Sequence, residues 1–381
     1  MADAAALAAP PLPEFKGRPG WEFTDLSGLD LDAYEPAPPG TGGERVLEVP
    51  GDGAGAGEAI VATLADAVEQ HPELVEPHLG NVVAADDPFV ARNAWREGLF
   101  VYVPRGVRVE GPIARDAVTG SAGTALSHRT LIVLEEGAEA EVWEQYLSSE
   151  DGDALLNAVT EIVVGPNARL RYVSAQGLSE RSWIFGTQRA LVDRDGELDW
   201  VALGFGSARG KVRMETRLSG PGAGAKVTGA YAGRARQHLD FDTTQEHAAP
   251  DTTSDLAFRG VLAGRATAVW RGMIKVDPGA QRTDAFQESR NLLLSKRAHA
   301  DAIPGLEIEA NDVRCTHAAA IAQIDREQVF YLMSHGLRRE QATRLVIDGF
   351  LEALVERFAE GPLRDAVSAA LERRLEAVLG G

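Results

Sequence analysis

A cysteine and a histidine two positions apart, Cys315 and His317, are the residues whose types and spacing most suggest chemistry in this sequence. Cys315 is the single cysteine among 381 residues. If the segment is a β-strand, residues i and i+2 point to the same face, so the thiol and the imidazole would project side by side. Iron and zinc both accept thiolate and imidazole ligands. The pair is therefore a candidate for soft-metal or sulfur chemistry.

Cys315 and His317 alone make at most half of a tetrahedral metal site. Closed zinc sites take four ligands, at spacings such as C-x2-C and H-x3-H that this sequence lacks. A small buried cysteine beside a hydrogen-bonded histidine is the simpler, structural explanation. If the pair does act on metal, the missing ligands must come from another chain or a transient substrate. Glu309 is an even number of positions from Cys315 and His317, so on one unbroken strand all three side chains would point to the same face. Its carboxylate is therefore a further candidate iron ligand.

The composition is that of an ordinary globular protein, with 44% hydrophobic and 25% charged residues. The net charge is −19, and the basic residues are mostly interleaved with acids, which disfavours binding to nucleic acid. No stretch of 18 apolar residues predicts a membrane span, and the N-terminus lacks the basic start of a signal peptide. A single cysteine excludes an internal disulfide framework. We therefore expect a cytoplasmic protein that binds neither nucleic acid nor membrane.

Three regions of different character follow one another along the chain. Residues 1–90 combine a Pro/Gly-rich stretch with helical spacing of apolar residues at 58–79, so we expect a mostly helical N-terminal region. Residues 91–322 contain short runs rich in Val, Leu, Tyr and Trp, separated by glycine-centred turns. Residues 323–381 have the spacing of three helices, with Asp325 as the N-cap of the first.

The central region carries a loose internal repeat. Its turns begin at Glu136, Gly165, Asp195 and Gly222, about 26–30 residues apart. Recurrence at this length is typical of a stacked solenoid, and strands between the turns favour a parallel β-helix. The alternative is an ordinary β-sandwich, which also has glycine turns at short intervals. A solenoid would leave few free strand edges and form a rigid platform.

Several longer motifs resemble the SufB/SufD family of iron–sulfur cluster assembly proteins. They are QHLDFDTTQEH at 237–247, PDTTSD at 250–255, FRGVL at 258–262, RGMI at 271–274, GAQ at 279–281, NLLLS at 291–295, PGLEI at 304–308, CTH at 315–317 and DREQVFYL at 325–332. The resemblance covers residues 95–360 well. The chain is most similar to the SufD side of the family, because SufB-like chains are longer and contain several cysteines.

The resemblance implies a mainly β fold, a right-handed parallel β-helix flanked by helical N-terminal and C-terminal regions. It also implies a non-enzymatic scaffold subunit that pairs with a SufB-like subunit and docks a SufC-like ABC ATPase through its C-terminal helices. His317 matches a family histidine that faces the SufB subunit. A nascent iron–sulfur cluster would then form at the heterodimer interface near His317 and Cys315, and the chain alone would hold no cofactor stably. A homodimer of the isolated chain also fits.

The C-terminal helices offer five candidates for ATPase docking, namely Phe330, Tyr331, Leu345, Phe350 and Leu354. The chain contains no Gly-x4-Gly-Lys-Ser/Thr motif, so ATP hydrolysis is assigned to the partner. A helix–turn–helix interpretation of residues 325–358 would suggest DNA binding, but these helices are acidic and have no basic recognition face.

Two other functions and one departure from the family pattern stay open. A β-helix can carry a polysaccharide-processing enzyme, although aromatic residues are only 6% of this chain. The chain can also be a purely structural partner of the SufB-like scaffold.

The family usually has glycine where this chain has Ala318, and an alanine would be strained there only if φ is positive. His247 is expected to be structural, and Trp270 and Phe286 to lie in the core or an interface.

Overall fold

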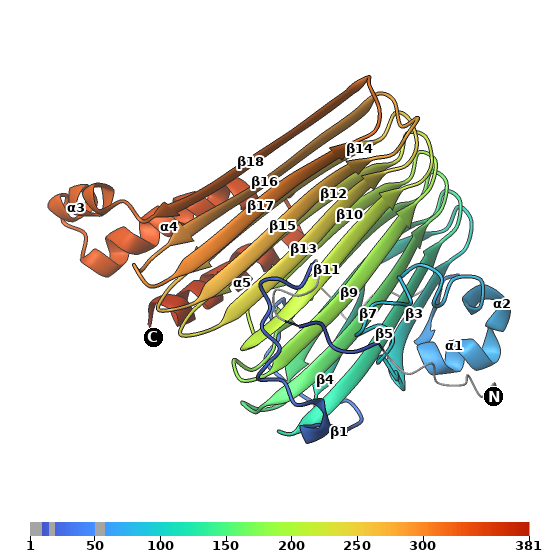
Figure 1. The fold of residues 1–381 in the computed structure, drawn as a ribbon, viewed down its shortest axis with the longest axis horizontal. Helices are drawn as coiled ribbons and strands as arrows, with labels where there is room; N and C mark the ends of the chain where they lie inside the picture. The colour runs from blue at the N-terminus through green and yellow to red at the C-terminus, as the bar shows by residue number, and fades with distance from the viewer. Residues whose placement is uncertain (1–9, 15–19, 50–57, 381) are drawn as a thin grey trace.

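The protein is described by a computed structural model that covers residues 10–14, 20–49 and 58–380. Its central feature is a solenoid in which strands β3–β18 alternate between two parallel sheets (Figure 1). The first sheet has the order β17-β15-β13-β11-β9-β7-β5-β3-β2, and the second has the order β18-β16-β14-β12-β10-β8-β6-β4. The predicted parallel β-helix is thereby confirmed, and the β-sandwich alternative is wrong.

The strands of the first sheet are β3 (Glu97–Val103), β5 (Thr124–Leu134), β7 (Ala154–Val164), β9 (Trp183–Val192), β11 (Arg209–Leu218), β13 (His238–His247), β15 (Thr267–Val276) and β17 (His299–Ile308). Those of the second are β4 (Arg108–Thr119), β6 (Glu139–Ser148), β8 (Arg169–Gly177), β10 (Glu197–Gly204), β12 (Gly224–Gly233), β14 (Thr253–Leu262), β16 (Thr283–Leu293) and β18 (Val313–Gln323). At its far edge the first sheet adds β2 (Ile60–Thr63), which is antiparallel to β3.

The turns of the repeat stack on one another, as their spacing predicts. Gly137, Asn167, Asp195 and Gly222 all have positive φ, between 55° and 76°, which glycine, asparagine and aspartate tolerate best. Successive turns are joined by backbone hydrogen bonds, for example 2.8 Å from Gly137 N to Pro166 O and 2.8 Å from Asn167 N to Arg194 O. Local turn chemistry therefore fixes where each strand begins and keeps the rungs in register.

Large side chains stack inside the solenoid. Trp200, Trp270, Tyr172, Tyr231 and Phe258 are all fully buried between the two sheets. Burying a large apolar side chain stabilises a fold by roughly 1.5–3 kcal/mol, so this column is a main source of the solenoid's stability. Trp270 accordingly belongs to the core, one of the two environments expected for it.

The N-terminal region is less helical than the sequence suggests. Its described part contains a short 3-10 helix η1 (Leu31–Ala33), β1 (Glu35–Pro36), α1 (Leu64–Gln70) and α2 (Pro72–Val75), and the rest is mostly irregular. The helix expected over 58–79 begins only at Leu64, because Ile60–Thr63 pairs with β3 as β2. At residues 60–63, tertiary strand pairing therefore overrides the helical spacing, and the helices of the described N-terminal part are short.

The C-terminal region consists of α3 (Arg326–Ser334), α4 (Arg339–Val355) and α5 (Pro362–Leu379), as predicted. The Asp325 side chain accepts hydrogen bonds from the backbone N–H groups of Glu327 and Gln328, so it is the expected N-cap. Leu351, Leu354, Val367 and Leu371 of α4 and α5 pack with apolar residues on the outer face of the second sheet. In Figure 1 α3 projects past the tip of strand β18, at the left of the view.

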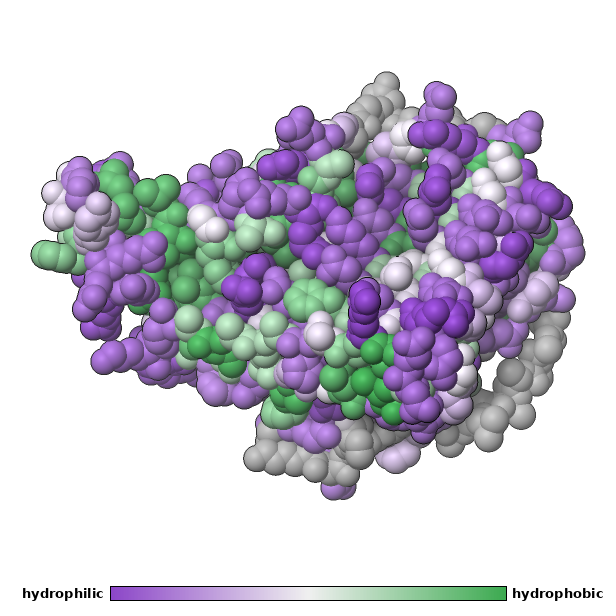
Figure 2. Space-filling view, turned by 90° about the horizontal axis from the view of Figure 1, so that it is seen from above, coloured by the Kyte–Doolittle hydropathy of each residue, from purple (hydrophilic) through white to green (hydrophobic). Residues whose placement is uncertain are grey.

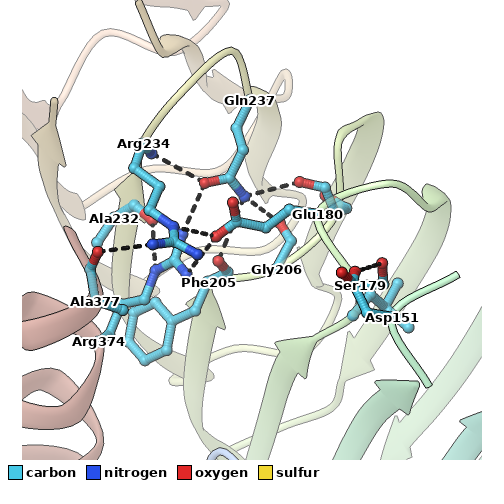
Figure 3. Close-up of polar contacts among 12 residues, drawn as sticks. Asp151, Ser179, Glu180, Phe205, Gly206, Ala232, Arg234, Gln237, Arg374 and Ala377 are labelled. Carbon is cyan, nitrogen blue, oxygen red and sulfur yellow. Dashed lines mark hydrogen bonds and ion pairs between the residues drawn. The ribbon is translucent and has the colours of Figure 1, made fainter. Parts of the chain in front are cut away.

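A polar clamp holds the end of α5 on the solenoid (Figure 3). Arg374 donates to Glu180 at 2.9 Å and to Gln237 at 2.7 Å. Arg234 donates to the same Glu180 carboxylate at 2.7 Å and to the carbonyl of Ala377 at 3.0 Å. Because Arg374 is largely buried, these bonds fix α5 much more firmly than a surface ion pair would. None of the described helices is both long and apolar enough to span a bilayer.

Candidate functional site

The solenoid ends at two strand edges. In the described part of the chain, β17 and β18 stand last in their sheets and have no partner on their outer edges. Leu306, Ile308 and Ile321 on these strands expose 38%, 41% and 45% of their surface. Unpaired strand edges with exposed apolar side chains are templates for pairing with another chain. We call the exposed edges and side chains of β17 and β18 the open end.

Cys315 and His317 both lie on β18, at the open end. Their register partners on β16 are Ala285 and Gln287, which are buried in the solenoid interior. Because parallel strands in register share their pleat, Cys315 and His317 face the same inward side. Inward side chains are covered at earlier turns, but no described turn follows β18, so His317 is exposed and Cys315 is half-buried.

The environment of Cys315 keeps its thiol protonated. The residue packs with a small apolar cluster that includes Ala285, Ala310 and Val313. Burial, together with the negative charge of Asp284, raises the pKa of the Cys315 thiol. A thiol with a raised pKa is a weak nucleophile and a weak metal ligand. A partner that supplies positive charge or a metal ion would reverse this effect.

Glu309 does not share a strand with the pair. It follows the end of β17, where its N–H donates to the carbonyl of Val276 at 2.9 Å, and the chain turns before β18 begins at Val313. The parity argument for Glu309 is therefore wrong, because its condition of an unbroken strand is not met. Among the described residues, no group of three or more His, Cys, Asp or Glu side chains is arranged to hold a metal ion.

Gln287 lies next to His317 on the preceding strand of the second sheet, one turn deeper in the solenoid. The Cys-Thr-His motif did not point to this residue. Its Nε2 donates to the carbonyls of Gly272 at 3.2 Å and Gly305 at 3.1 Å, so it ties the two sheets together one turn below the open end. Its buried Oε1 has no hydrogen-bond partner among the residues that the structure describes. The sequence does contain a signal for Gln287, because it lies one repeat of 30 residues before His317.

Ala318 occupies an ordinary strand position. It pairs in register with Glu288 and is not among the residues with positive φ. The alanine therefore causes no backbone strain at this position.

A second exposed apolar surface lies on α3 and α4. Phe330 and Tyr331 expose 71% and 61%, and Leu345 exposes 50%. Met333, which the sequence did not single out, exposes 38%. We call these four residues the tail surface; Figure 2 shows hydrophobic residues gathered toward the end of the molecule where α3 projects.

The other two predicted docking residues pack against the solenoid. Phe350 is half-buried, and the guanidinium carbon of Arg259 lies 5.3 Å from its ring centre. Leu354 is completely buried in the cluster between α4 and the second sheet. Leu354 has no surface to offer a partner because the helical stripe to which it belongs faces the solenoid, so it is removed from the docking residues.

Two family comparisons agree with this architecture. The model described as SUF system FeS cluster assembly, SufBD core domain, matches residues 117–350. The model described as SufBD protein N-terminal region matches residues 54–114. The chain belongs to the SufBD family. The resemblance noted in the sequence motifs is thereby confirmed, and iron–sulfur cluster assembly is the process with which this family is associated.

Individual SufBD relatives are similar over most of the chain. The iron–sulfur cluster assembly protein SufD of Bacillus subtilis is 32% identical over 324 residues, which cover 83% of this chain and 74% of that protein. SufBD family proteins of Staphylococcus saprophyticus and Staphylococcus haemolyticus are each 30% identical. Those two alignments cover 79% of this chain, but the chain spans only 65% of the length of each staphylococcal relative.

Proposed function

We propose that this protein is a SufD-like scaffold subunit that pairs through its open end with a SufB-like subunit. The observation on which this rests is that one surface combines unpaired strand edges, exposed Leu306, Ile308 and Ile321, and the donor pair Cys315 and His317. A partner that pairs with the edge of β18 would cover the apolar side chains and bring its own ligands to the donor pair.

The nascent cluster is the cargo of this surface. The imidazole of His317 is exposed and can bind iron as a neutral ligand, whereas the Cys315 thiol must first lose its proton. A positive charge or an iron ion near Cys315 would oppose the effect of Asp284 and favour the thiolate. The half-site would then be completed across the interface, and the chain itself needs no catalytic residue.

The tail surface is proposed to dock an ABC-type ATPase. Phe330 and Tyr331 are large, exposed and adjacent on a helix that projects from the solenoid, which suits hot-spot contacts with a partner. α4 and α5 connect this surface mechanically to the second sheet, which ends in β18. ATP-driven movement of the tail could thus reach the open end through packed elements.

The pairing can be tested by co-purification with the SufB-like subunit. Ile321→Asp is expected to weaken the complex at least ~10-fold, because an uncompensated carboxylate would be buried in the interface. Val61→Asp is the matched control, since Val61 is similarly exposed, at 40%, on β2 at the opposite end of the first sheet. Undiminished pairing of the Ile321→Asp protein would refute the interface.

The same complex tests the donor role. His317→Ala is expected to leave pairing intact and to lower the iron and sulfide bound per reconstituted complex. An unchanged iron and sulfide content would instead support the purely structural partner, in which this chain supplies no ligand.

A further inference from the structure

A cleft of about 510 Å³ lies far from the open end, over the outer face of the first sheet. Its floor consists of Ala125 and Ser127 on β5 and their register partners Leu155 and Asn157 on β7. One wall is formed by residues 31–38 and the other by residues 89–97. A cleft of this size suits a small organic molecule.

A packed aromatic cluster supports one wall of the cleft. Phe89 lines it and stacks on Phe185, with ring centres 3.7 Å apart and an interplanar angle of 10°. Trp21 belongs to the same cluster and stacks on Phe89, with ring centres 5.4 Å apart. Leu31 and Tyr34 pack against this cluster from the opposite wall. Phe89 is itself only 2% exposed, so this cluster is a fixed apolar backing for one wall, and the half-buried Tyr34 ring presents an aromatic surface on the other. A fixed cleft of this kind favours a flat ligand, which loses little conformational entropy on binding.

The floor of the cleft also contains a buried polar side chain, that of Asn157. It is only 4% exposed, and its Nδ2 donates to the carbonyl of Phe89 at 2.9 Å. That bond fixes the orientation of the amide, so its Oδ1 remains an acceptor that is buried and has no partner among the described residues. Buried acceptors are nearly always paired in native proteins. A ligand with an N–H or O–H group would supply the missing donor.

The charges at the cleft favour an anion. Arg92 and Arg96 both line it, and neither forms an ion pair within the described ranges. Arg92 is held in place by a 2.8 Å bond to the carbonyl of Pro88. Glu97 also lines the cleft, so two positive charges face one negative charge.

From these features we propose that the cleft is a binding site for a small aromatic or heteroaromatic monoanion that carries a hydrogen-bond donor. The ring lies against Tyr34 and the apolar wall at Phe89, Asn157 Oδ1 accepts from the donor, and Arg92 and Arg96 attract the acidic group. Glu97 disfavours a second negative charge on the ligand. The site is independent of the open end and of the tail surface.

The test uses 8-anilino-1-naphthalenesulfonate, an aromatic monoanion with one N–H group, in a fluorescence titration of the full chain. Its neutral counterpart, N-phenyl-1-naphthylamine, has the same rings without the sulfonate. Both titrations are made in a Phe330→Ala/Tyr331→Ala background, which removes the two aromatic side chains of the tail surface as competing dye sites. We expect saturable binding of the sulfonate at low salt, with about one site per chain.

Four substitutions locate the dye and test the charge argument. Ser127→Phe fills the floor and should remove binding of both dyes. Arg96→Gln should weaken only the sulfonate, by about 2- to 5-fold, whereas Glu97→Gln should strengthen it. Arg115→Gln makes the same charge change on β4 of the second sheet, where Arg115 is exposed, and should have no effect.

Opposite effects of Arg96→Gln and Glu97→Gln on one ligand cannot come from a loss of folding, so they identify a direct charge interaction. The proposal is overturned if Ser127→Phe leaves both the affinity and the number of sulfonate molecules bound per chain unchanged. It is also overturned if Arg96→Gln and Arg115→Gln weaken the sulfonate equally, because the dye would then respond only to net charge.

Discussion

At the scale of single residues, burial decides which titratable groups are structural and which are available. His247 is completely buried, and its ring nitrogens lie 2.8 Å from Thr252 Oγ1 and 2.9 Å from Ser254 Oγ. Burial lowers the pKa of His247 to about 4. The structural role expected for His247 is therefore confirmed. His317, in contrast, lies exposed on β18 and is available to a partner.

The depressed pKa of His247 predicts a loss of stability in mild acid. The unfolded chain takes up a proton on this histidine near pH 6.5, whereas the folded chain does so only near pH 4. The stabilisation is therefore complete above pH 6.5 and is lost as the pH falls from 6.5 toward 4, by at most about 3 kcal/mol. Urea unfolding of the wild type and His247→Gln should show their difference in unfolding free energy shrinking over this range. A constant difference would contradict the prediction.

At the scale of elements, the three C-terminal helices differ in how much of their surface is buried. α5 buries seven residues and is clamped through Arg374 and Arg234, whereas α3 buries only Val329. α4 connects the two, with Leu354 turned to the solenoid and Leu345 to solvent. α5 thus anchors the C-terminal region on the solenoid, whereas α3 presents an exposed surface to a partner.

This division predicts that docking and stability can be separated. Phe330→Ala/Tyr331→Ala should weaken binding of the ABC ATPase at least ~10-fold, because exposed aromatic residues often dominate an interface. The unfolding free energy should change by less than about 1 kcal/mol, since both side chains are already solvated. Calorimetric titration with the ATPase measures the first effect and urea unfolding the second.

Leu379→Ala is the control for this experiment, because Leu379 is also exposed, at 37%, but lies at the end of α5. ATPase binding that resists the double substitution would exclude the tail surface as the docking site.

At the scale of the whole molecule, an open strand edge coexists with a net charge of −19. The edge favours association, whereas charge repulsion between like copies opposes it. In the absence of a SufB-like partner, the balance between these two effects should set the oligomeric state.

We therefore predict that the isolated chain forms a homodimer through its open end, and that added salt strengthens the dimer by screening the repulsion. Sedimentation velocity at low and high ionic strength measures this, and Ile321→Asp should shift the protein toward monomer. A chain that stays monomeric at high salt and high concentration, or a dimer insensitive to Ile321→Asp, would refute the prediction.

Much of the architecture follows from local sequence, because a solenoid repeats the same short-range pattern. The turns at Gly137, Asn167, Asp195 and Gly222 carry their own conformational preference, so their spacing was enough to predict stacked parallel strands. The cap at Asp325 and the three helices after it are likewise local features. The shared face of Cys315 and His317 follows directly from the strand pleat.

Tertiary structure alone decided which of these residues are accessible. Nothing in the spacing of Leu345 and Leu354 shows that one meets solvent and the other the second sheet. Helical periodicity at 58–79 could not reveal that Ile60–Thr63 would pair with β3. Counting positions along a presumed strand could not show that β17 ends before Glu309. Exposure, pairing and pKa depend on which segments meet in space, and a pattern within one segment does not contain that information.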